Sequence, residues 1–101
     1  MKDQIVRKIF SGLIYIHILH HGSEDNFYGS WMIEELKEHG YNVSPGTIYP
    51  ILKTMVDEGL LIREDKIVGG KIRKYYEATE EGKNLLIDLK KNLKVLMEEI
   101  L

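Results

Sequence analysis

The chain of 101 residues contains no cysteine and only two prolines. Without cysteine there is neither a disulfide nor a thiolate metal ligand, and this absence is compatible with a reducing cytoplasm. The chain has few prolines, 44% apolar residues and 30% charged residues, which is the composition of a folded globular protein rather than of a disordered one. This length is sufficient for one domain with its own apolar core.

The chain also lacks an apolar run long enough to cross a bilayer. Basic residues precede residues 9–19, as they would in a secretory signal. However, Ser11, Tyr15 and His17 interrupt this run, and no small-residue cleavage site follows it. We therefore expect a buried helix here, in a cytoplasmic protein with no membrane partner.

Motifs of catalysis are missing as well. There is no Ser/His/Asp or Cys/His arrangement in a recognisable context, no glycine-rich phosphate loop and no metal triad. We predict that the protein is not an enzyme and uses no cofactor.

Charge is present but unevenly distributed along the chain, whose net charge is −2. Residues 66–76 hold four basic side chains and no acidic one, whereas residues 24–39 hold five acidic side chains and one lysine. Clustering of positive charge indicates nucleic-acid binding better than net charge does. The basic segment is therefore a candidate DNA contact.

The spacing of apolar residues predicts a first helix over residues 4–21, ended by Gly22. This helix carries one apolar stripe, which consists of Ile5, Ile9, Leu13 and Ile16. Residues 23–28 are predicted to form a polar loop, and a short second helix lies between Gly29 and Gly40. The buried face of the second helix consists of Met32, Ile33 and Leu36.

Ser44 and Pro45 mark the start of a third helix, because serine favours the N-cap and proline suits the first helical position. This helix runs to about residue 58 and is stopped by Gly59. Pro50, in its interior, removes a backbone hydrogen bond and should kink it. The inner face consists of Ile48, Ile51, Leu52 and Met55.

Residues 60–68 and 72–78 are rich in apolar and β-branched side chains, and Gly69 and Gly70 between them suit a two-residue hairpin turn. Thr79 then caps a last helix. This order predicts a mostly α fold with a β-hairpin wing, a winged helix-turn-helix. We expect a DNA-binding domain over residues 1–78 and a C-terminal dimerisation helix over residues 79–101, in one structural unit.

In this fold the third helix reads DNA with the face opposite its apolar stripe. The candidate residues there are Ser44, Gly46, Thr47, Tyr49, Pro50 and Lys53. Lys71, Arg73 and Lys74 follow the hairpin turn, where a wing reaches the phosphate backbone or the minor groove. We expect Tyr75 or Tyr76 to pack the wing onto the helices. The alternative to DNA contact is that the third helix simply exposes a polar face to solvent and that the basic residues form a solvated hairpin tip.

The last helix has the spacing of a coiled-coil seam. Its apolar residues recur at intervals of three and four: Leu86, Leu89, Leu93, Leu96 and Ile100. Leu85 and Met97 widen the stripe, which indicates a second contact surface, with the first helix as its partner. We predict a homodimer through this seam; the alternative is a stripe that covers only its own domain.

The histidines raise the question of a metal. His17 and His21 lie four residues apart on the first helix with His20 beside them, a spacing that can hold zinc. Clustered histidines at a helix end are more typical of surface residues that favour the C-terminal dipole. No third ligand of certain geometry is evident, although Glu24 and Asp25 are near. We predict no metal site, and whether these histidines bind metal stays open.

Four aromatic residues are candidates for lining a small-ligand cavity near a dimer interface: Phe10, Tyr15, Phe27 and Trp31. Large aromatic side chains more often fill cores. Both roles are compatible with the positions of these residues in the sequence.

Several segments resemble the PadR family of transcriptional regulators: YGSWMIEEL at 28–36, SPGTIYPIL at 44–52, EGLL at 58–61, GGKIRKYY at 69–76 and TEEG at 79–82. The run 44–52 is the most specific. The resemblance implies a dimeric repressor on a palindromic operator, released in some members by a small aromatic or phenolic ligand. It also implies a proline in the recognition helix, as Pro50 is here.

The chain is similar to the short subgroup with a single C-terminal helix. Some drug-sensing relatives carry a tryptophan on that helix, which this chain lacks, so the resemblance does not extend to a multidrug site. The main prediction is a dimeric, sequence-specific DNA-binding regulator. The alternative is a winged-helix module for protein–protein assembly, in which the basic wing would be incidental.

Overall fold

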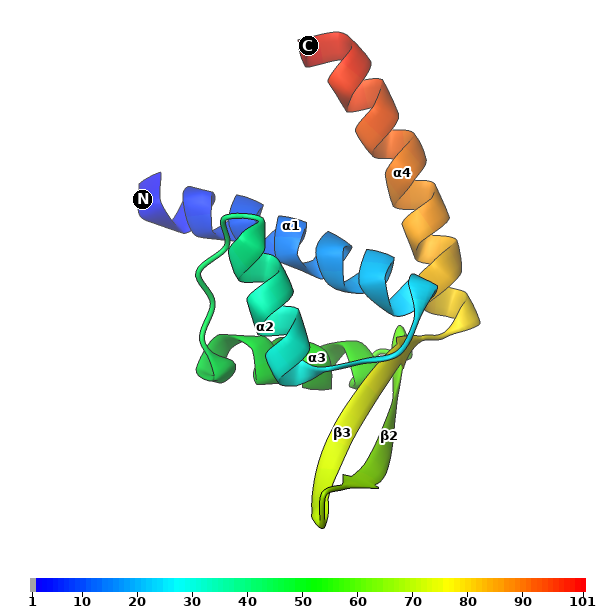
Figure 1. The fold of residues 1–101 in the computed structure, drawn as a ribbon. Coiled ribbons are helices and arrows are strands. Elements are labelled where there is room, and N and C mark those ends of the chain that lie inside the picture. The colour runs from blue at the N-terminus through cyan, green and yellow to red at the C-terminus, as the bar shows by residue number, and fades with distance from the viewer. Residues whose placement is uncertain (1) are drawn as a thin grey trace.

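The computed structural model describes residues 2–101, so Met1, the first residue of the expected DNA-binding domain, lies outside the described residues. The elements follow in the order α1 (Lys2–Glu24), β1 (Phe27–Tyr28), α2 (Gly29–Glu38), α3 (Pro45–Asp57), β2 (Leu61–Val68), β3 (Lys71–Ala78) and α4 (Glu80–Ile100). Helices α1 to α3 form a body, from which the β2–β3 hairpin and the free end of α4 project to opposite sides (Figure 1). This is the winged helix-turn-helix arrangement that the sequence predicts.

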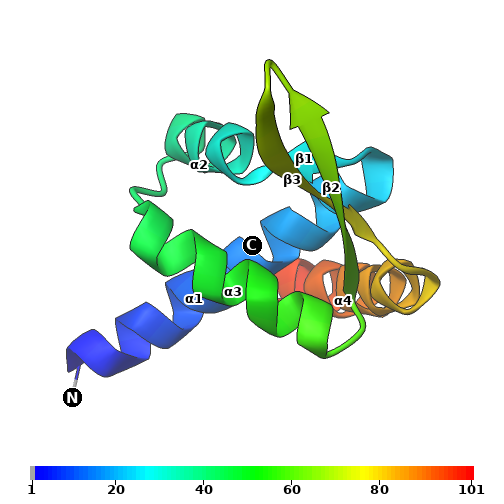
Figure 2. The same ribbon diagram turned by 90° about the horizontal axis from the view of Figure 1, so that it is seen from below.

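One apolar core joins the three helices of the body to the base of the hairpin. Its fully buried side chains are Ile18, Leu19, Met32, Leu36, Ile48, Leu52, Met55 and Leu61. The inner faces predicted for α2 and α3 are therefore confirmed, with Ile33 and Ile51 packed at the edge of the core. Figure 2, viewed from below, brings α3 to the front of the body with the hairpin beside it.

The stripe predicted for the first helix reaches the core only at its C-terminal end, where Ile16 packs against it. Ile14, Ile18 and Leu19 face the core, whereas Ile5 and Ile9 are 61% and 58% exposed. Helix α1 carries apolar residues on two faces, and spacing alone does not say which of them covers the core of its own chain. The other face is left uncovered along the N-terminal part of the helix.

Gly22 does not end α1, which continues to Glu24. Gly22 is buried where the helix passes β3, and a Cβ atom there would lie 3.2 Å from the backbone nitrogen of Ala78. The glycine allows this close approach and does not terminate the helix. Glycine is common both at helix ends and where two backbones pack closely, so the presence of glycine at position 22 does not distinguish these two roles.

The predicted polar loop over residues 23–28 contains the short strand β1. It pairs with β3 in antiparallel register, Phe27 with Tyr76 and Tyr28 with Tyr75, which gives a three-stranded sheet in the order β1-β3-β2. A strand of two residues shows no alternation of polarity, and only the neighbouring strand stabilises it. The sequence therefore gave no sign of it.

The hairpin follows the prediction closely. Gly69 and Gly70 have φ angles of 59° and 78°, the left-handed conformation that a two-residue turn of this kind requires. The turn sets a register that runs from the Val68–Lys71 pair to the Leu61–Ala78 pair. The two glycines thus determine which side chains of the wing share a face.

The predicted helix caps are largely confirmed. Ser44 has the extended backbone of an N-cap and Pro45 follows it, although within residues 2–101 the Ser44 side chain caps no backbone N–H. Gly59, with a φ of 78°, ends the α3 segment. Thr79 caps α4, because its Oγ1 accepts a hydrogen bond of 3.1 Å from the Gly82 N–H. Helix α3 is continuous through Pro50.

Within residues 2–101, every helix is too short or too polar to span a membrane.

Candidate nucleic-acid interface

The face of α3 that points away from the core is exposed at every predicted position. These residues are Ser44, Gly46, Thr47, Tyr49, Pro50 and Lys53. Lys53 Nζ lies 2.8 Å from Asp57 Oδ2 in an exposed pair one turn apart. Such pairs contribute little to stability, so the Lys53 ammonium can exchange Asp57 for a phosphate or a base edge at small cost.

Tyr49 leans across the start of α2. A Cβ atom on Gly29 would lie 2.5 Å from the phenol oxygen of Tyr49, so the absence of a side chain at Gly29 makes room for the ring. From this position Tyr49 borders two hollows, of about 440 Å³ and about 470 Å³. The first also includes Lys71 and Arg73, and the second includes Lys53.

The basic residues of the wing divide between its two faces. The Arg73 guanidinium lies 4.3 Å above the ring of Tyr28, a cation–π contact on the side of β1. Lys74, the next residue on the strand, borders both hollows and shares the second with Tyr49 and Lys53. The wing thus presents positive charge beside α3, on the side of the molecule opposite the free end of α4 (Figure 1).

Tyr76 anchors the wing to the body. It is 4% exposed, and its ring stacks on Phe27 with 5.8 Å between the centroids. Burial raises the pKa of the Tyr76 phenol above its ordinary value. Of the two tyrosines that the sequence proposed for this role, Tyr76 is the buried one, and Tyr75 packs half-buried against Tyr28.

The structure adds Arg63 to this surface. Arg63 lies on β2 opposite Tyr76 and borders the same hollow as Lys53 and Lys74. Its Nε is 3.1 Å from Asp65 Oδ1. Arg63 was not predicted because it lies outside the basic segment 66–76, although the Gly69-Gly70 turn places it opposite Tyr76.

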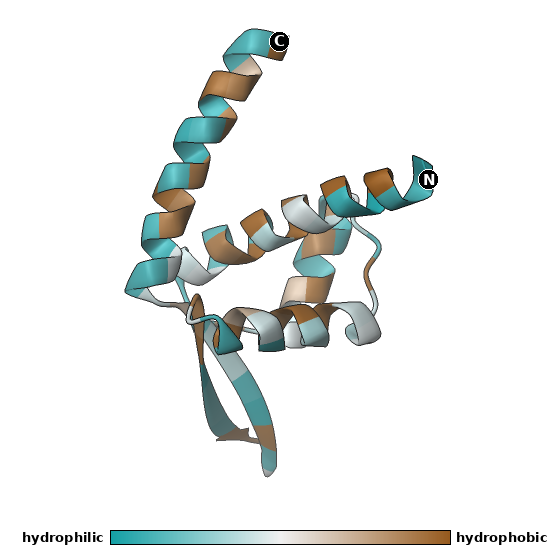
Figure 3. Ribbon diagram, turned by 180° about the vertical axis from the view of Figure 1, so that it is seen from behind, coloured by the Kyte–Doolittle hydropathy of each residue, from teal (hydrophilic) through white to brown (hydrophobic). Residues whose placement is uncertain are grey.

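The predicted seam of α4 is buried only where the helix packs on the body. Leu86 is buried and Leu89 and Leu93 are half-buried, whereas Leu96 and Ile100 are 49% and 65% exposed. Figure 3 shows hydrophobic residues recurring along α4 to its free end and along α1. A groove of about 250 Å³ between these helices is bordered by apolar residues of both.

All four histidines of the chain gather where α1 and α2 end. His17 lies 5.4 Å from His39 and 6.3 Å from His21 between ring centroids, and the rings of His20 and His21 are 4.9 Å apart. Burial, followed by the neighbouring histidines, lowers the pKa of His17 below its ordinary value. Burial and His20 lower the pKa of His21 in the same way.

The four candidate aromatic residues separate into two groups. Phe27 and Trp31 border a cavity of about 460 Å³, together with the acidic side chains Glu24, Asp25 and Glu35. Phe10 instead packs edge-on against Tyr41, and Tyr15 packs half-buried against the core.

Comparison with known proteins decides the family. Residues 18–88 match the Transcriptional regulator PadR-like family. The chain belongs to this family. It is 38% identical over 96 residues to the transcriptional regulator Rv3488 of Mycobacterium tuberculosis, an alignment that covers 95% of this chain and 90% of the relative.

Solved structures agree with this assignment. A PadR-like transcriptional regulator of Bacillus cereus has a TM-score of 0.83 and 30% identity, with 92% of each chain covered. PadR of Bacillus subtilis, solved in complex with operator DNA, has a TM-score of 0.68 and 31% identity over 76% of this chain and 44% of that chain. The chain is thus a PadR-type transcriptional regulator with a winged helix-turn-helix fold, as predicted.

Proposed function

We propose that the protein is a cytoplasmic homodimer that binds a palindromic operator with α3 and the wing and represses transcription. The observation that carries the proposal is the common surface formed by the exposed face of α3 and the basic side chains of β3, which meet around Tyr49. An exposed helix face can enter a major groove while a wing contacts the flanking phosphates. The operator complex of Bacillus subtilis PadR supports this assignment.

Dimerisation is supported by the apolar side chains that the single chain leaves uncovered. Apart from Ile62, Ile67 and Ile72 of the wing, most of them lie on α1 and on the outer half of α4 and include Ile5, Ile9, Leu96, Met97 and Ile100. A large exposed apolar surface of this kind is typical of a subunit interface. Two-fold pairing through it would present two copies of α3 to the two halves of a palindrome.

The decisive experiment is the selection of genomic DNA fragments on the purified protein, followed by affinity measurements on the enriched site. Alanine at Thr47, Tyr49 or Lys53 should reduce discrimination by about 1–3 kcal/mol where a base contact is lost. Lys91→Ala is the matched control, since it removes an exposed positive charge from α4, far from α3 in the chain. Operator affinity unchanged in all three variants would show that another surface reads the DNA.

The alternative function, protein–protein assembly through the winged helix, is tested by the same material. Phosphate contacts give every DNA-binding protein measurable affinity at low salt, which falls as salt is added. Absence of binding to any duplex at low salt would favour the assembly module.

The proposal includes release from DNA by a small aromatic ligand in the cavity beside Trp31. The carboxylates around this cavity favour a neutral or cationic aromatic compound over an anionic phenolic acid. Trp31 is the single tryptophan of the chain, so its fluorescence reports occupancy directly. A saturable change in emission, accompanied by loss of operator binding, is expected; emission that does not respond to such compounds would contradict this part of the proposal.

A further inference from the structure

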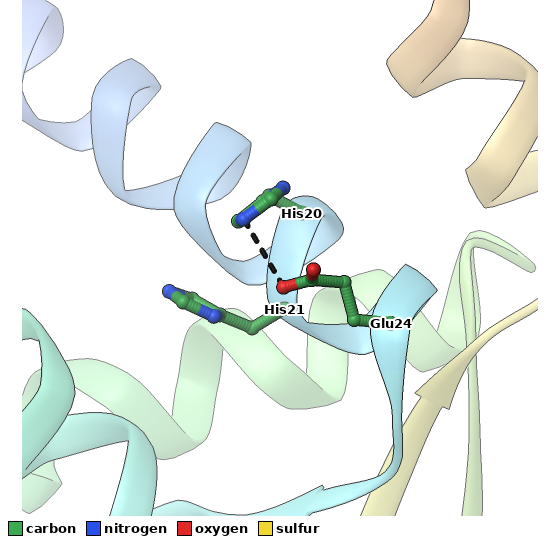
Figure 4. A group of neighbouring side chains, drawn as sticks. All are labelled: His20, His21 and Glu24. Atoms are coloured by element: carbon green, nitrogen blue, oxygen red, sulfur yellow. Dashed lines mark ion pairs between the residues drawn. The ribbon is translucent and has the colours of Figure 1, made fainter.

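Three potential metal ligands meet at the end of α1. His20, His21 and Glu24 each bring one ligand atom within 4.8 Å of the other two. Figure 4 shows the Glu24 carboxylate beside the two imidazole rings, with His20 Nε2 3.2 Å from Glu24 Oε1. We propose that these residues form a binding site for a divalent transition-metal ion of the Zn²⁺ class.

The donor set selects the kind of ion. Two imidazole nitrogens and one carboxylate oxygen are a frequent set of three protein ligands for zinc, with water in the fourth position. Calcium and magnesium prefer oxygen ligands throughout, so they are excluded as the intended occupants. Thiolate-requiring ions are excluded because the chain has no cysteine.

The distances allow the site to close around an ion. Ligand atoms of a tetrahedral zinc site, with bonds of about 2.0–2.1 Å, lie roughly 3.3 Å apart. The His20 and Glu24 side chains are 45% and 66% exposed, so side-chain rotation can draw the three donors together without displacing the core. The contact between His20 Nε2 and Glu24 Oε1 would give way to bonds from both atoms to the ion.

His21 is the fixed member of the set. Its side chain is only 14% exposed, and its ring packs edge-on against Trp31 with 5.4 Å between centroids. Its Nε2 lies 3.6 Å from Glu35 Oε1. A carboxylate beside a liganding imidazole is the usual outer partner that orients the ring and raises its affinity for metal.

The surroundings favour a cation. The site lies in the last turn of α1, where the helix dipole places negative charge. His21 and Glu24 also border the cavity of about 460 Å³, which has room for coordinated water. The sequence pointed to His17 and His21, but in the structure the donor that completes the set is Glu24, and His17 lies outside it.

The test uses the whole protein without a histidine tag, treated with chelator and dialysed. Zn²⁺ is titrated by calorimetry and Co²⁺ by visible absorption. We expect one ion per protomer, with affinity reduced at least about 10-fold in His21→Ala and in Glu24→Gln. His39→Ala is the matched control, because His39 belongs to the histidine cluster but not to the donor set, and it should bind as the parent does.

Thermal unfolding provides a second measurement that detects folding defects. Zn²⁺ should raise the Tm of the parent and of His39→Ala but not that of Glu24→Gln, because an ion that binds only the folded state stabilises it. Binding without one-to-one saturation, or an equal loss in His39→Ala, would overturn the proposal. DNA binding is not a readout here, so failure of the metal site leaves the regulator assignment unaffected.

Discussion

Thr79 and Gly82 join the first turn of α4 to the end of α3. Thr79 Oγ1 donates a hydrogen bond of 2.6 Å to the Gly59 carbonyl and accepts one from the Gly82 N–H. A Cβ atom on Gly82 would collide with the carbonyl oxygen of Leu60. Because both partners are backbone, neither can move aside without shifting the junction between the two helices.

At this residue we predict that Gly82→Ala lowers the free energy of unfolding by about 1–3 kcal/mol, the usual cost of forcing atoms into a packed site. Gly46→Ala is the control, since Gly46 also lies in the first turn of a helix but its Cβ would meet nothing closer than 3.6 Å. The control should be neutral or stabilising by up to about 1 kcal/mol. Urea unfolding at a fixed protein concentration measures both; equal effects would contradict the collision.

Tyr76 predicts a dependence on alkaline pH. Because burial raises the pKa of its phenol above 10 in the folded protein, the unfolded chain loses this proton first as pH rises. The stability that depends on protonated Tyr76 is therefore present below pH 10 and is lost as pH rises through the folded pKa. Between about pH 8 and about pH 10.5, the parent should lose more stability than Tyr76→Phe. Parallel losses in the two proteins would argue against burial of the phenol.

At the scale of the element, the wing is a two-stranded ribbon whose side chains are placed by its turn. Lys74 pairs across the ribbon with Asp65, whose carboxylate is already held by Arg63. Tyr76, two residues further on, is buried against the body. The base of the wing is therefore fixed while its basic side chains stay exposed.

This arrangement predicts the salt dependence of DNA binding. Each neutralised phosphate steepens the fall of log K with log salt by about 0.9, so Lys74→Ala should flatten the slope by roughly 2 per dimer. Operator and non-operator DNA should lose affinity together, because phosphates carry no base identity. Parent, Lys74→Ala and the Lys91→Ala control are compared at several salt concentrations. Identical slopes for variants at Lys71, Arg73 and Lys74 would remove the wing from the interface.

In the molecule as a whole, the wing projects to the side opposite the free end of α4 (Figure 1). The first turns of helix α4 pack on the body, and its last turns extend beyond the body into solvent. Subunits that pair through α1 and α4 would leave α3 and the wing of each free for DNA.

Leu96→Glu tests this assembly. Leu96 is 49% exposed in the single chain, so the substitution should spare the protomer fold and place a charge in the apolar interface. We expect monomers in sedimentation and loss of binding to a palindromic site whose halves lie about 34–36 Å apart. Lys91→Glu, which adds the same side chain off the apolar stripe, should stay dimeric. A folded parent that is monomeric at tens of micromolar would contradict the dimer.

Much of the candidate DNA surface follows from local signals. Pro45, Gly59, Thr79 and the Gly69-Gly70 pair act within a few residues of themselves, through φ preferences and caps that do not depend on the rest of the chain. They set where α3 begins and ends and which side chains the wing presents. The exposed positions of α3 and β3 could for this reason be named in advance.

The order of the helices, the position of the hairpin turn and the resemblance to the family could thus be predicted from the sequence, because they depend on local spacing and on a specific motif. Three features required the folded structure: the face of α1 that covers the core, the strand that Phe27 and Tyr28 form against β3, and the meeting of Glu24 with His20 and His21. The physical reason is the same in each case. Local preferences allow several arrangements for a helix with two apolar faces, for a strand of two residues and for a side chain at a helix end. Packing against distant segments of the chain selects one of these arrangements.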